Sequence, residues 1–184
     1  MHRYASLFIF IIALGCSSTK DKTEYSSNKT PDLPVTEASS KYMRMVGDSE
    51  FDPEKDDPNF KLCFSENQVR QYFNFGRGLQ YEGEKKALVE HFFKQYKPVD
   101  TDQSGLIRVR FIVNCKGETG RFRLIEADEN YQKTKFDERI TQQLLTLTKS
   151  LKGWKPQADE YAERDFYQYL VFKIKNGDLI EMMP

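Results

Sequence analysis

The sequence predicts an α+β fold in which an antiparallel sheet packs against helices. Three observations predict it. Apolar and polar residues alternate over Leu106–Asn114 and Asp165–Lys175, and this period of two indicates half-buried strands. Between them, apolar residues recur every three or four positions from Phe136 to Leu151, which indicates an amphipathic helix. The dipeptide Asn176-Gly177 then predicts a tight hairpin.

Two further helices are expected in front of the sheet. The first opens at Ser65–Gln68, where a hydroxyl is followed three residues later by Gln, the spacing of a capping box. Its apolar face is expected to hold Val69, Tyr72 and Phe73. The second helix spans Glu84–Tyr96, has apolar side chains four residues apart, and ends before Pro98.

The elements of the sheet follow in the order strand, strand, helix, strand, strand. The first strand turns back through Lys116-Gly117-Glu118 into a return strand at Gly120–Glu126. The helix begins near Thr134 and is ended by Gly153. After the long strand to Lys175, the hairpin brings back the last strand, Leu179–Met182. The inward residues expected on the first strand are Ile107, Val109, Phe111 and Val113.

The N-terminus has the pattern of an export signal. An apolar run at Leu7–Leu14 is too short to span a bilayer but fits the apolar region of a signal peptide. The residues before Cys16 are Ala13-Leu14-Gly15, and they resemble a bacterial lipobox, in which the cysteine carries the lipid. We therefore expect cleavage after residue 15 and lipidation of Cys16. The alternative is an ordinary secretory signal that happens to contain a cysteine.

A tether and one folded domain are expected after the signal peptide. Residues 16–58 are rich in Ser, Thr, Lys, Asp, Glu and Pro and show no sustained period, which is typical of a flexible tether. The apolar stretch Tyr42–Val46 interrupts it and could dock on the domain as an extra edge strand. The folded domain is expected at residues 59–184.

Charge and composition exclude some classes of function. The chain has 28 basic and 28 acidic residues, so it lacks the basic excess of a nucleic-acid binder. After signal cleavage His91 is the single histidine, and it lies in an expected helix, where a structural or surface role is favoured. We find no constellation for catalysis, for a resident metal or for a cofactor.

Two acidic stretches are interpreted as structural. Asp100–Gly105 is similar to the first half of a calcium-binding EF-hand loop, but Phe111 stands where the closing Glu is required, so a turn is expected. The acids between Glu126 and Glu129 are expected in a solvated loop. An enzyme would need several acids converging in a deep pocket near Glu84, and the sequence does not predict one.

Cys63 and Cys115 are left as a pair once Cys16 carries lipid. In an exported protein an even pair favours a disulfide, although two separately buried thiols are the alternative. The bond would close a loop of about 52 residues, which corresponds to roughly 4 kcal/mol of stabilisation. The two cysteines are not in a Cys-x-x-Cys arrangement, which argues against redox catalysis.

The second half of the chain resembles the C-terminal domain of TonB-type energy transducers. The resemblance runs from about Tyr96 to Pro184, and no single motif in it is specific; the order and spacing carry it. The residues that carry it are Gly105–Asn114 (GLIRVRFIVN), Gly117, Phe136-Asp137, Leu151–Pro156 (LKGWKP) and Phe172-Lys173-Ile174 before Asn176-Gly177.

Membership of that family would imply a binding role. Such domains contact outer-membrane receptors by pairing a sheet edge with an extended segment of the partner. Carried over by position, the edge would be the strand 166–175 together with Leu179–Met182. The expected contact residues are Phe166, Tyr167, Tyr169, Val171 and Lys173. The alternative is that upstream helices cover these aromatic side chains.

The expected function is that of a non-enzymatic lipoprotein in the bacterial cell envelope. We expect it on the outer membrane facing the periplasm, where it would bind a protein partner such as an outer-membrane receptor. A transducer also needs an N-terminal transmembrane helix and a long Pro-rich spacer, and neither pattern occurs before the domain. Binding is therefore expected without energy transduction. The alternative is a structural envelope protein whose sheet edge is covered.

Overall fold

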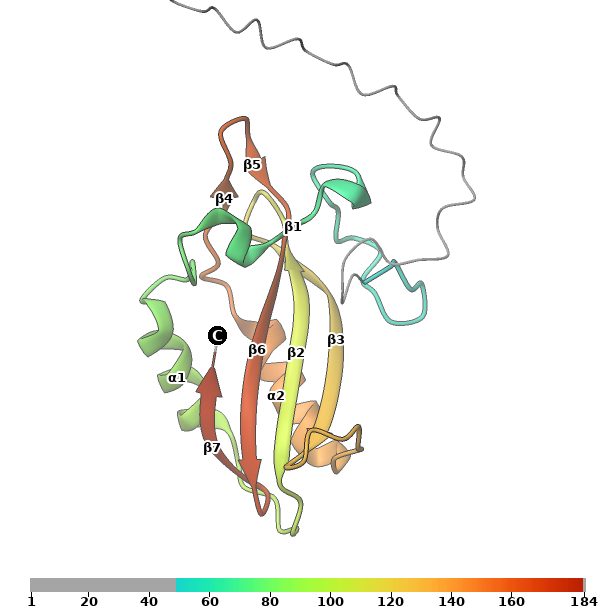
Figure 1. Cartoon of the computed structure of the whole chain (residues 1–184), viewed down its shortest axis with the longest axis vertical. Coiled ribbons are helices and arrows are strands. Elements are labelled where there is room, and N and C mark those ends of the chain that lie inside the picture. The colour runs from blue at the N-terminus through green and yellow to red at the C-terminus, as the bar shows by residue number, and fades with distance from the viewer. Residues whose placement is uncertain (1–48, 184) are drawn as a thin grey trace, which may run out of the picture. The chain divides into compact units, whose positions relative to one another are not determined.

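A computed structural model describes residues 49–183, which form a mixed α+β domain with one main sheet and two α-helices (Figure 1). Within these residues no helix has both the length and the apolar composition needed to cross a membrane. The helical elements are the 3-10 helices η2 (Glu66–Gln68) and η3 (Tyr72–Phe75) and the helices α1 (Glu84–Gln95) and α2 (Glu138–Ser150). The strands are β1 (Arg70–Gln71), β2 (Gly105–Val113), β3 (Thr119–Asp128), β4 (Gln157–Ala158), β5 (Glu163–Arg164), β6 (Phe166–Lys175) and β7 (Asp178–Met183).

The main sheet has the order β1–β6–β2–β3, and β7 also pairs with β6. β2 lies in the middle and pairs antiparallel with β3 on one side and with β6 on the other. β7 pairs antiparallel with the second half of β6, whereas β1 pairs in parallel with its first two residues. The predicted order of strands and helix after residue 105 is therefore confirmed, with the short hairpin β4–β5 inserted before β6.

Both α-helices cover one face of the sheet, and the core lies between them and the strands (Figure 1). The side chains predicted to face inward from β2 are all fully buried. Phe92 of α1 packs on Phe172 of β6 with 4.6 Å between ring centroids. Phe111 of β2 packs on Trp154 in the segment after α2, at 5.2 Å. Aromatic contacts thus join both helical segments to the central strands.

α2 begins and ends close to the predicted positions. Asp137 is its N-cap, and its carboxylate accepts a hydrogen bond from the Arg139 N–H at 2.8 Å. The predicted apolar stripe faces the core, where Ile140 and Leu144 are fully buried. Leu151 is the C-cap and is itself buried, so the apolar period fixes the whole length of the helix.

The predicted hairpin joins β6 to β7. Asn176 and Gly177 both have positive φ, 50° and 78°, which is the conformation of a type I′ turn. The turn is fastened to the segment after α1, because the Tyr96 hydroxyl donates to the Gly177 carbonyl at 2.8 Å. A Cβ on Gly177 would lie 1.8 Å from the Val99 carbonyl oxygen, so glycine is required for space as well as for backbone angle.

The helix predicted after Ser65 does not form. The segment consists instead of η2, the two-residue strand β1 and η3. Ser65 makes no capping bond to the backbone, and Val69 is extended with ψ 122°. Val69 is buried against Ile112 and Tyr167 on the other face of the sheet. This contact, together with the pairing of β1 with β6, outweighs the weak local preference for a helix.

Residues 49–75 form a strap. Up to Val69 it lies on the sheet face opposite the two α-helices, β1 then joins the sheet, and Phe75 packs against the core. We call it the N-terminal strap. Two bidentate ion pairs fasten it to β3: Asp56 with Arg123 and Glu66 with Arg121, each with N–O distances of 2.6–2.7 Å. Ser49 is also buried, and its N–H donates to the Tyr167 hydroxyl at 3.0 Å. The strap therefore covers the half of this face where β6 begins.

The position of the strap corrects the expected start of the domain. The tether was predicted to extend to residue 58, but Ser49 and Asp56 are buried in the domain. The predicted boundary is therefore too late by about ten residues, because polar composition conceals ion pairs that form only with β3. The signal peptide at 1–15, the lipidation of Cys16, the tether from 16 to 48 and the docking of Tyr42–Val46 lie outside the described residues.

Candidate partner-binding surface

β6 was expected to be an edge strand, and the structure corrects this. β2 pairs with β6 from Phe166 to Ile174 on one side. On the other side β1 pairs with Phe166 and Tyr167, and β7 pairs with Val171–Lys175. β6 is not an edge because two strands of the same chain, β1 and β7, pair with its outer side. Only the short stretch between β1 and β7, at residues 168–170, has no strand partner on that side within the described part.

The five residues expected to contact a partner differ in how far they are buried. Phe166 is fully buried in the core and packs on Phe75, with 5.8 Å between ring centroids. Tyr167 lies beneath the N-terminal strap, and the Arg110 guanidinium lies 4.3 Å from its ring centroid. These two residues are therefore not available to a partner. The alternative, that upstream helices cover these aromatic side chains, is not what the structure shows for Tyr167, because the N-terminal strap covers it.

Tyr169 lies at the margin of the strap. Its hydroxyl is 3.3 Å from that of Tyr72, and the two rings meet edge to face. The hydrogen bond to Tyr169, together with burial, raises the pKa of Tyr72 to about 12. This contact holds the end of the strap against β6. Of the two remaining expected contact residues, Val171 is buried and so is not available to a partner, whereas Lys173 is exposed.

The sheet has its open edge at β7. Among the described residues, β7 pairs only with β6, and its other side carries no strand. Ile180 sits at a register shift, where it has no opposite residue on β6, and the residue is 43% exposed. A β-bulge of this kind commonly stands on an edge strand.

The opposite edge, at β3, is partly occupied by the chain itself. Residues 129–135 fold back, so that Thr134 N–H donates to the Glu126 carbonyl at 3.3 Å and Ala127 bridges to Lys133. The strap fastens the other end of β3 through Arg121 and Arg123. The chain therefore occupies the β3 edge at residues 126–128, whereas no other strand pairs with β7 along its length in the described part. A hollow of about 410 Å³, lined by Leu124, Ile125 and Tyr131 among others, lies beside β3.

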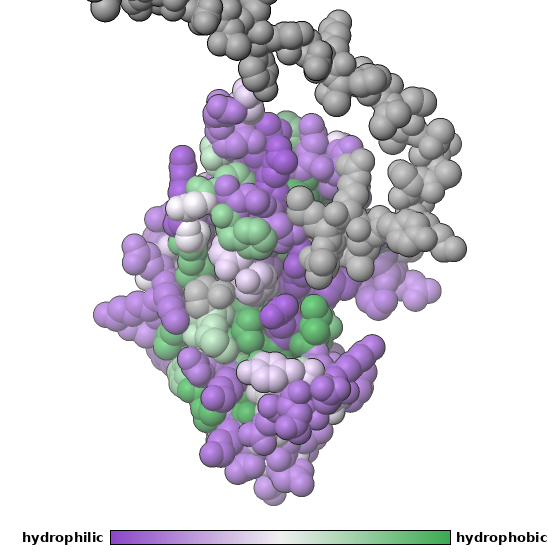
Figure 2. Space-filling view, viewed as in Figure 1, coloured by the Kyte–Doolittle hydropathy of each residue, from purple (hydrophilic) through white to green (hydrophobic). Residues whose placement is uncertain are grey.

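A hollow of about 370 Å³ lies on the uncovered half of the open sheet face, next to β7. Its apolar walls come from β2, β6 and β7, and its rim carries charges of both signs. The lining includes Leu106, Ile174, Ile180 and Met183, with Lys173, Lys175, Asp128 and Glu181 around them. Figure 2 shows apolar residues gathered across the lower middle of this face, with hydrophilic residues below them. An edge strand and an adjacent partly apolar hollow therefore stand side by side.

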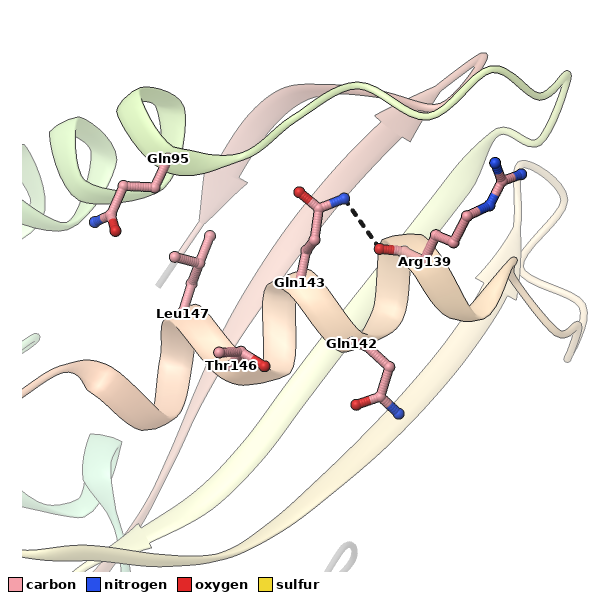
Figure 3. Close-up of a pocket in the computed structure, with 6 residues that line it drawn as sticks. All are labelled: Gln95, Arg139, Gln142, Gln143, Thr146 and Leu147. Atoms are coloured by element: carbon pink, nitrogen blue, oxygen red, sulfur yellow. Dashed lines mark hydrogen bonds between the residues drawn. The ribbon is translucent and has the colours of Figure 1, made fainter.

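Another hollow, of about 290 Å³, lies at the joint between α1 and α2, where polar side chains connect the two helices. Figure 3 shows Gln143 and Gln142 projecting from α2 in opposite directions. The Gln143 amide bonds to both the N–H and the carbonyl of Lys97, at 2.9 and 3.1 Å. His91 on α1 is likewise 3.2 Å from the Leu147 carbonyl near the end of α2. These polar groups are used in holding the two helices together, and Glu84 lines neither hollow.

The described structure contains a disulfide between Cys63 and Cys115, with 6.0 Å between their Cα atoms. It joins the N-terminal strap to the turn between β2 and β3. Asp165, just before β6, lies beside it and is fully buried. Its carboxylate accepts three backbone hydrogen bonds at 2.9–3.0 Å, from Cys63, Phe64 and Cys115. Sequence reasoning predicted the cysteine pair as one of two options and gave no sign of the aspartate.

Comparison of the chain with family models, with curated proteins and with solved structures finds no match. The functional proposal therefore depends on the surfaces described above. Of these, the β7 edge is the one that no strand or returning loop pairs with in the described part, and a hollow adjoins it; the joint between the helices and the surface beneath the strap are filled by the chain's own side chains.

Proposed function

We propose that this protein is a non-enzymatic, lipid-anchored binding module of the bacterial cell envelope that captures an extended segment of a partner protein. The observation that carries the proposal is the open edge of β7. The backbone N–H and C=O groups on an unpaired strand edge favour the addition of another strand, which forms hydrogen bonds without needing a particular sequence.

The hollow beside β7 would supply sequence preference. In an added strand, side chains point alternately to the two faces of the sheet, so every second side chain would face the open side. An apolar side chain there can reach Ile180 and Met183, and charged neighbours can pair with Lys173 or Glu181. Backbone pairing then provides affinity, and the hollow provides selection.

The resemblance to TonB C-terminal domains is kept as part of the proposal. The succession β2, β3, α2, β6 agrees with the order that the resemblance implies. The strand that would bind the partner by position is β6, and in this chain β1 and β7 already occupy its outer side. The strand addition is therefore assigned to β7, and no energy transduction is proposed.

Lipidation of Cys16 would set where the module works. The residue lies outside the described part of the chain, so the anchor is a proposal from the sequence alone. A chain held on the outer membrane and facing the periplasm would meet membrane-embedded partners such as outer-membrane receptors, with no need for strong binding in solution.

A second candidate function is favoured by the pairing of β6. A structural envelope protein with a covered edge and no capture of strands is consistent with β1 and β7 filling the outer side of β6. Amide exchange separates the two candidates. Protection along residues 178–183 that is as high as along β6 in the isolated protein would favour the structural role.

Two exposed isoleucines provide a matched test of strand capture. Ile180 on β7 and Ile125 on β3 are 43% and 48% exposed and stand at opposite edges of the sheet. A photo-crosslinking residue at position 180 of the lipid-anchored chain should capture a partner in native membranes through an extended segment. Ile180→Asp should reduce binding of that segment at least tenfold, because charge and desolvation oppose its seating.

Ile125→Asp is the control and should leave binding within twofold of the wild type. Both variants should keep the circular dichroism spectrum of the wild type, since both side chains already face solvent. Equal crosslinking from positions 125 and 180, or binding unaffected by Ile180→Asp, would contradict capture at β7.

A further inference from the structure

The cluster formed by Cys63, Cys115 and Asp165 has the composition of a metal site. One ligand atom from each residue lies within 4.8 Å of the other two. The three residues come from the N-terminal strap, the turn after β2 and the position before β6. Two sulfurs and a carboxylate oxygen are ligands that Zn²⁺ prefers, and sulfur ligands discriminate against Ca²⁺ and Mg²⁺.

Asp165 is unusual because it is a fully buried carboxylate without a cation beside it. Its side chain forms no ion pair with any residue of the described chain, and backbone N–H groups are its partners. An ionised carboxylate has about four acceptor positions, of which three are used here. Oδ2 accepts from Cys63 and Phe64, whereas Oδ1 accepts from Cys115 alone. Oδ1 therefore retains an acceptor position that a cation can occupy.

The disulfide and the metal site are alternatives that differ by two electrons. A dithiol reductant transfers two electrons and two protons to the bond between Cys63 and Cys115, which leaves two thiols, and the reductant becomes a disulfide. A divalent cation then displaces the two protons to solvent and is bound by two thiolates.

The separation of the two cysteines suits both states. Their Cα atoms are 6.0 Å apart in the disulfide. Around a tetrahedral zinc ion with bonds of about 2.3 Å, two sulfurs stand roughly 3.8 Å apart, which side-chain rotation can provide. Both cysteines are partly exposed, so a reductant and the ion have access and water can complete the coordination.

We propose that the reduced protein binds one thiophilic divalent cation, of which Zn²⁺ is the probe, through Cys63, Cys115 and Asp165. The ion takes the place of the disulfide as the link between the N-terminal strap and the turn after β2. The strap then stays fastened in both redox states. This inference is independent of strand capture at β7, and either can fail without the other.

Zinc titration of the full chain tests the site. The protein is reduced with a phosphine, freed of reductant without oxygen, and titrated by calorimetry. We expect one Zn²⁺ per reduced chain, bound at least tenfold more tightly than by Cys63→Ser/Cys115→Ser, and no such binding by the oxidised protein. Equal affinity of the reduced wild type and the double variant overturns the proposal.

Cobalt reports the ligands directly. Reduced wild type with Co²⁺ should show sulfur-to-metal charge transfer and the strong visible bands of a tetrahedral site, and both should be absent from the double variant. Absence of these bands in the reduced wild type contradicts thiolate ligation. Asp165→Asn should weaken Zn²⁺ binding, whereas the exposed control Glu54→Gln should not.

Because Asp165→Asn could disturb folding, its oxidised form is first checked for the disulfide and for the circular dichroism of the wild type. Should that variant fail the check, the melting temperature of reduced wild type replaces it. Zn²⁺ should raise that temperature by several degrees and leave that of the double variant unchanged; no rise in the wild type overturns the proposal.

Discussion

The ion pair between Asp56 and Arg123 fastens the N-terminal strap at the scale of single residues. The Asp56 side chain is 2% exposed, and the Arg123 guanidinium reaches both its oxygens and the Glu50 carbonyl. The hydrogen bond from Arg123 holds the pKa of Asp56 below its ordinary value of 3.8. The charged form is therefore the one that the folded protein stabilises.

A pH dependence follows from this pair. Because the pKa of Asp56 is lower in the folded chain, its contribution is present above about pH 4 and is lost as the pH falls through the folded pKa. We expect Asp56→Asn to reduce the free energy of unfolding by about 2 kcal/mol at pH 7, because Arg123 loses its partner. Urea unfolding at pH 7 and at pH 3 measures this, and the difference from the wild type should shrink at pH 3.

The neighbouring acid provides the control for that measurement. Glu54 is exposed, so Glu54→Gln should leave the free energy of unfolding unchanged at both pH values. A loss for Asp56→Asn that is as large at pH 3 as at pH 7 would show that its cause is not the charge.

Single residues also set the limit of what the sequence predicts. Cys63 and Cys115 are recognisable because cysteines are few and exported proteins form disulfides. Asp165 and Asp56 give no signal, because each is one acid among 28 acidic residues in the chain. Their roles depend on partners about 100 and 70 residues away in the sequence, which only folding brings near.

At the scale of elements, the turn between β6 and β7 holds the edge strand in place. Gly177→Ala should destabilise the protein in two ways, through a left-handed φ and through a clash with the Val99 carbonyl. Gly78→Ala is a matched control, since Gly78 also has positive φ but nothing lies near its missing Cβ. The backbone alone costs about 1–2 kcal/mol.

We therefore expect Gly177→Ala to lower the free energy of unfolding by clearly more than Gly78→Ala, and to increase amide exchange along β7. Denaturant unfolding and hydrogen exchange measure the two effects. Equal losses in the two variants would show that the contact with Val99 does not constrain the turn.

The elements that the sequence predicts are those whose period is long enough to read. β2, β3, α2 and β6 each show their apolar side over several residues, and β7 follows from the Asn176-Gly177 hairpin. β1 has two residues and so has no period, yet together with β7 it occupies the outer side of β6. The true edge was part of the prediction only as the hairpin partner of β6, and the hollow beside it needs β2 and β6 to meet.

At the scale of the whole molecule, the domain is a sheet with two different faces. The helices cover one face, and the N-terminal strap covers half of the other. The disulfide ties that strap to the turn after β2, across 52 residues of sequence. β1, at the end of the strap, pairs with the start of β6. β7 pairs with the end of β6, and its own outer side carries no strand in the described part. The disulfide and the ion pairs thus hold the covered part of the sheet, whereas the turn between β6 and β7 holds the open edge.

The disulfide should stabilise the whole domain mainly by restricting the unfolded chain. For a loop of this size, replacing both cysteines with Ala should lower the free energy of unfolding by about 4 kcal/mol, measured by guanidinium unfolding with a chelator present. The far-UV circular dichroism should not change, because the core beneath the helices contains neither cysteine. In this variant, amide exchange should increase less at Ser49 than at the residues next to position 63. The reason is that the Tyr167 hydroxyl still accepts the hydrogen bond of the Ser49 N–H. Loss of the sheet itself would mean that the strap is part of the folding core and not a cover added to it.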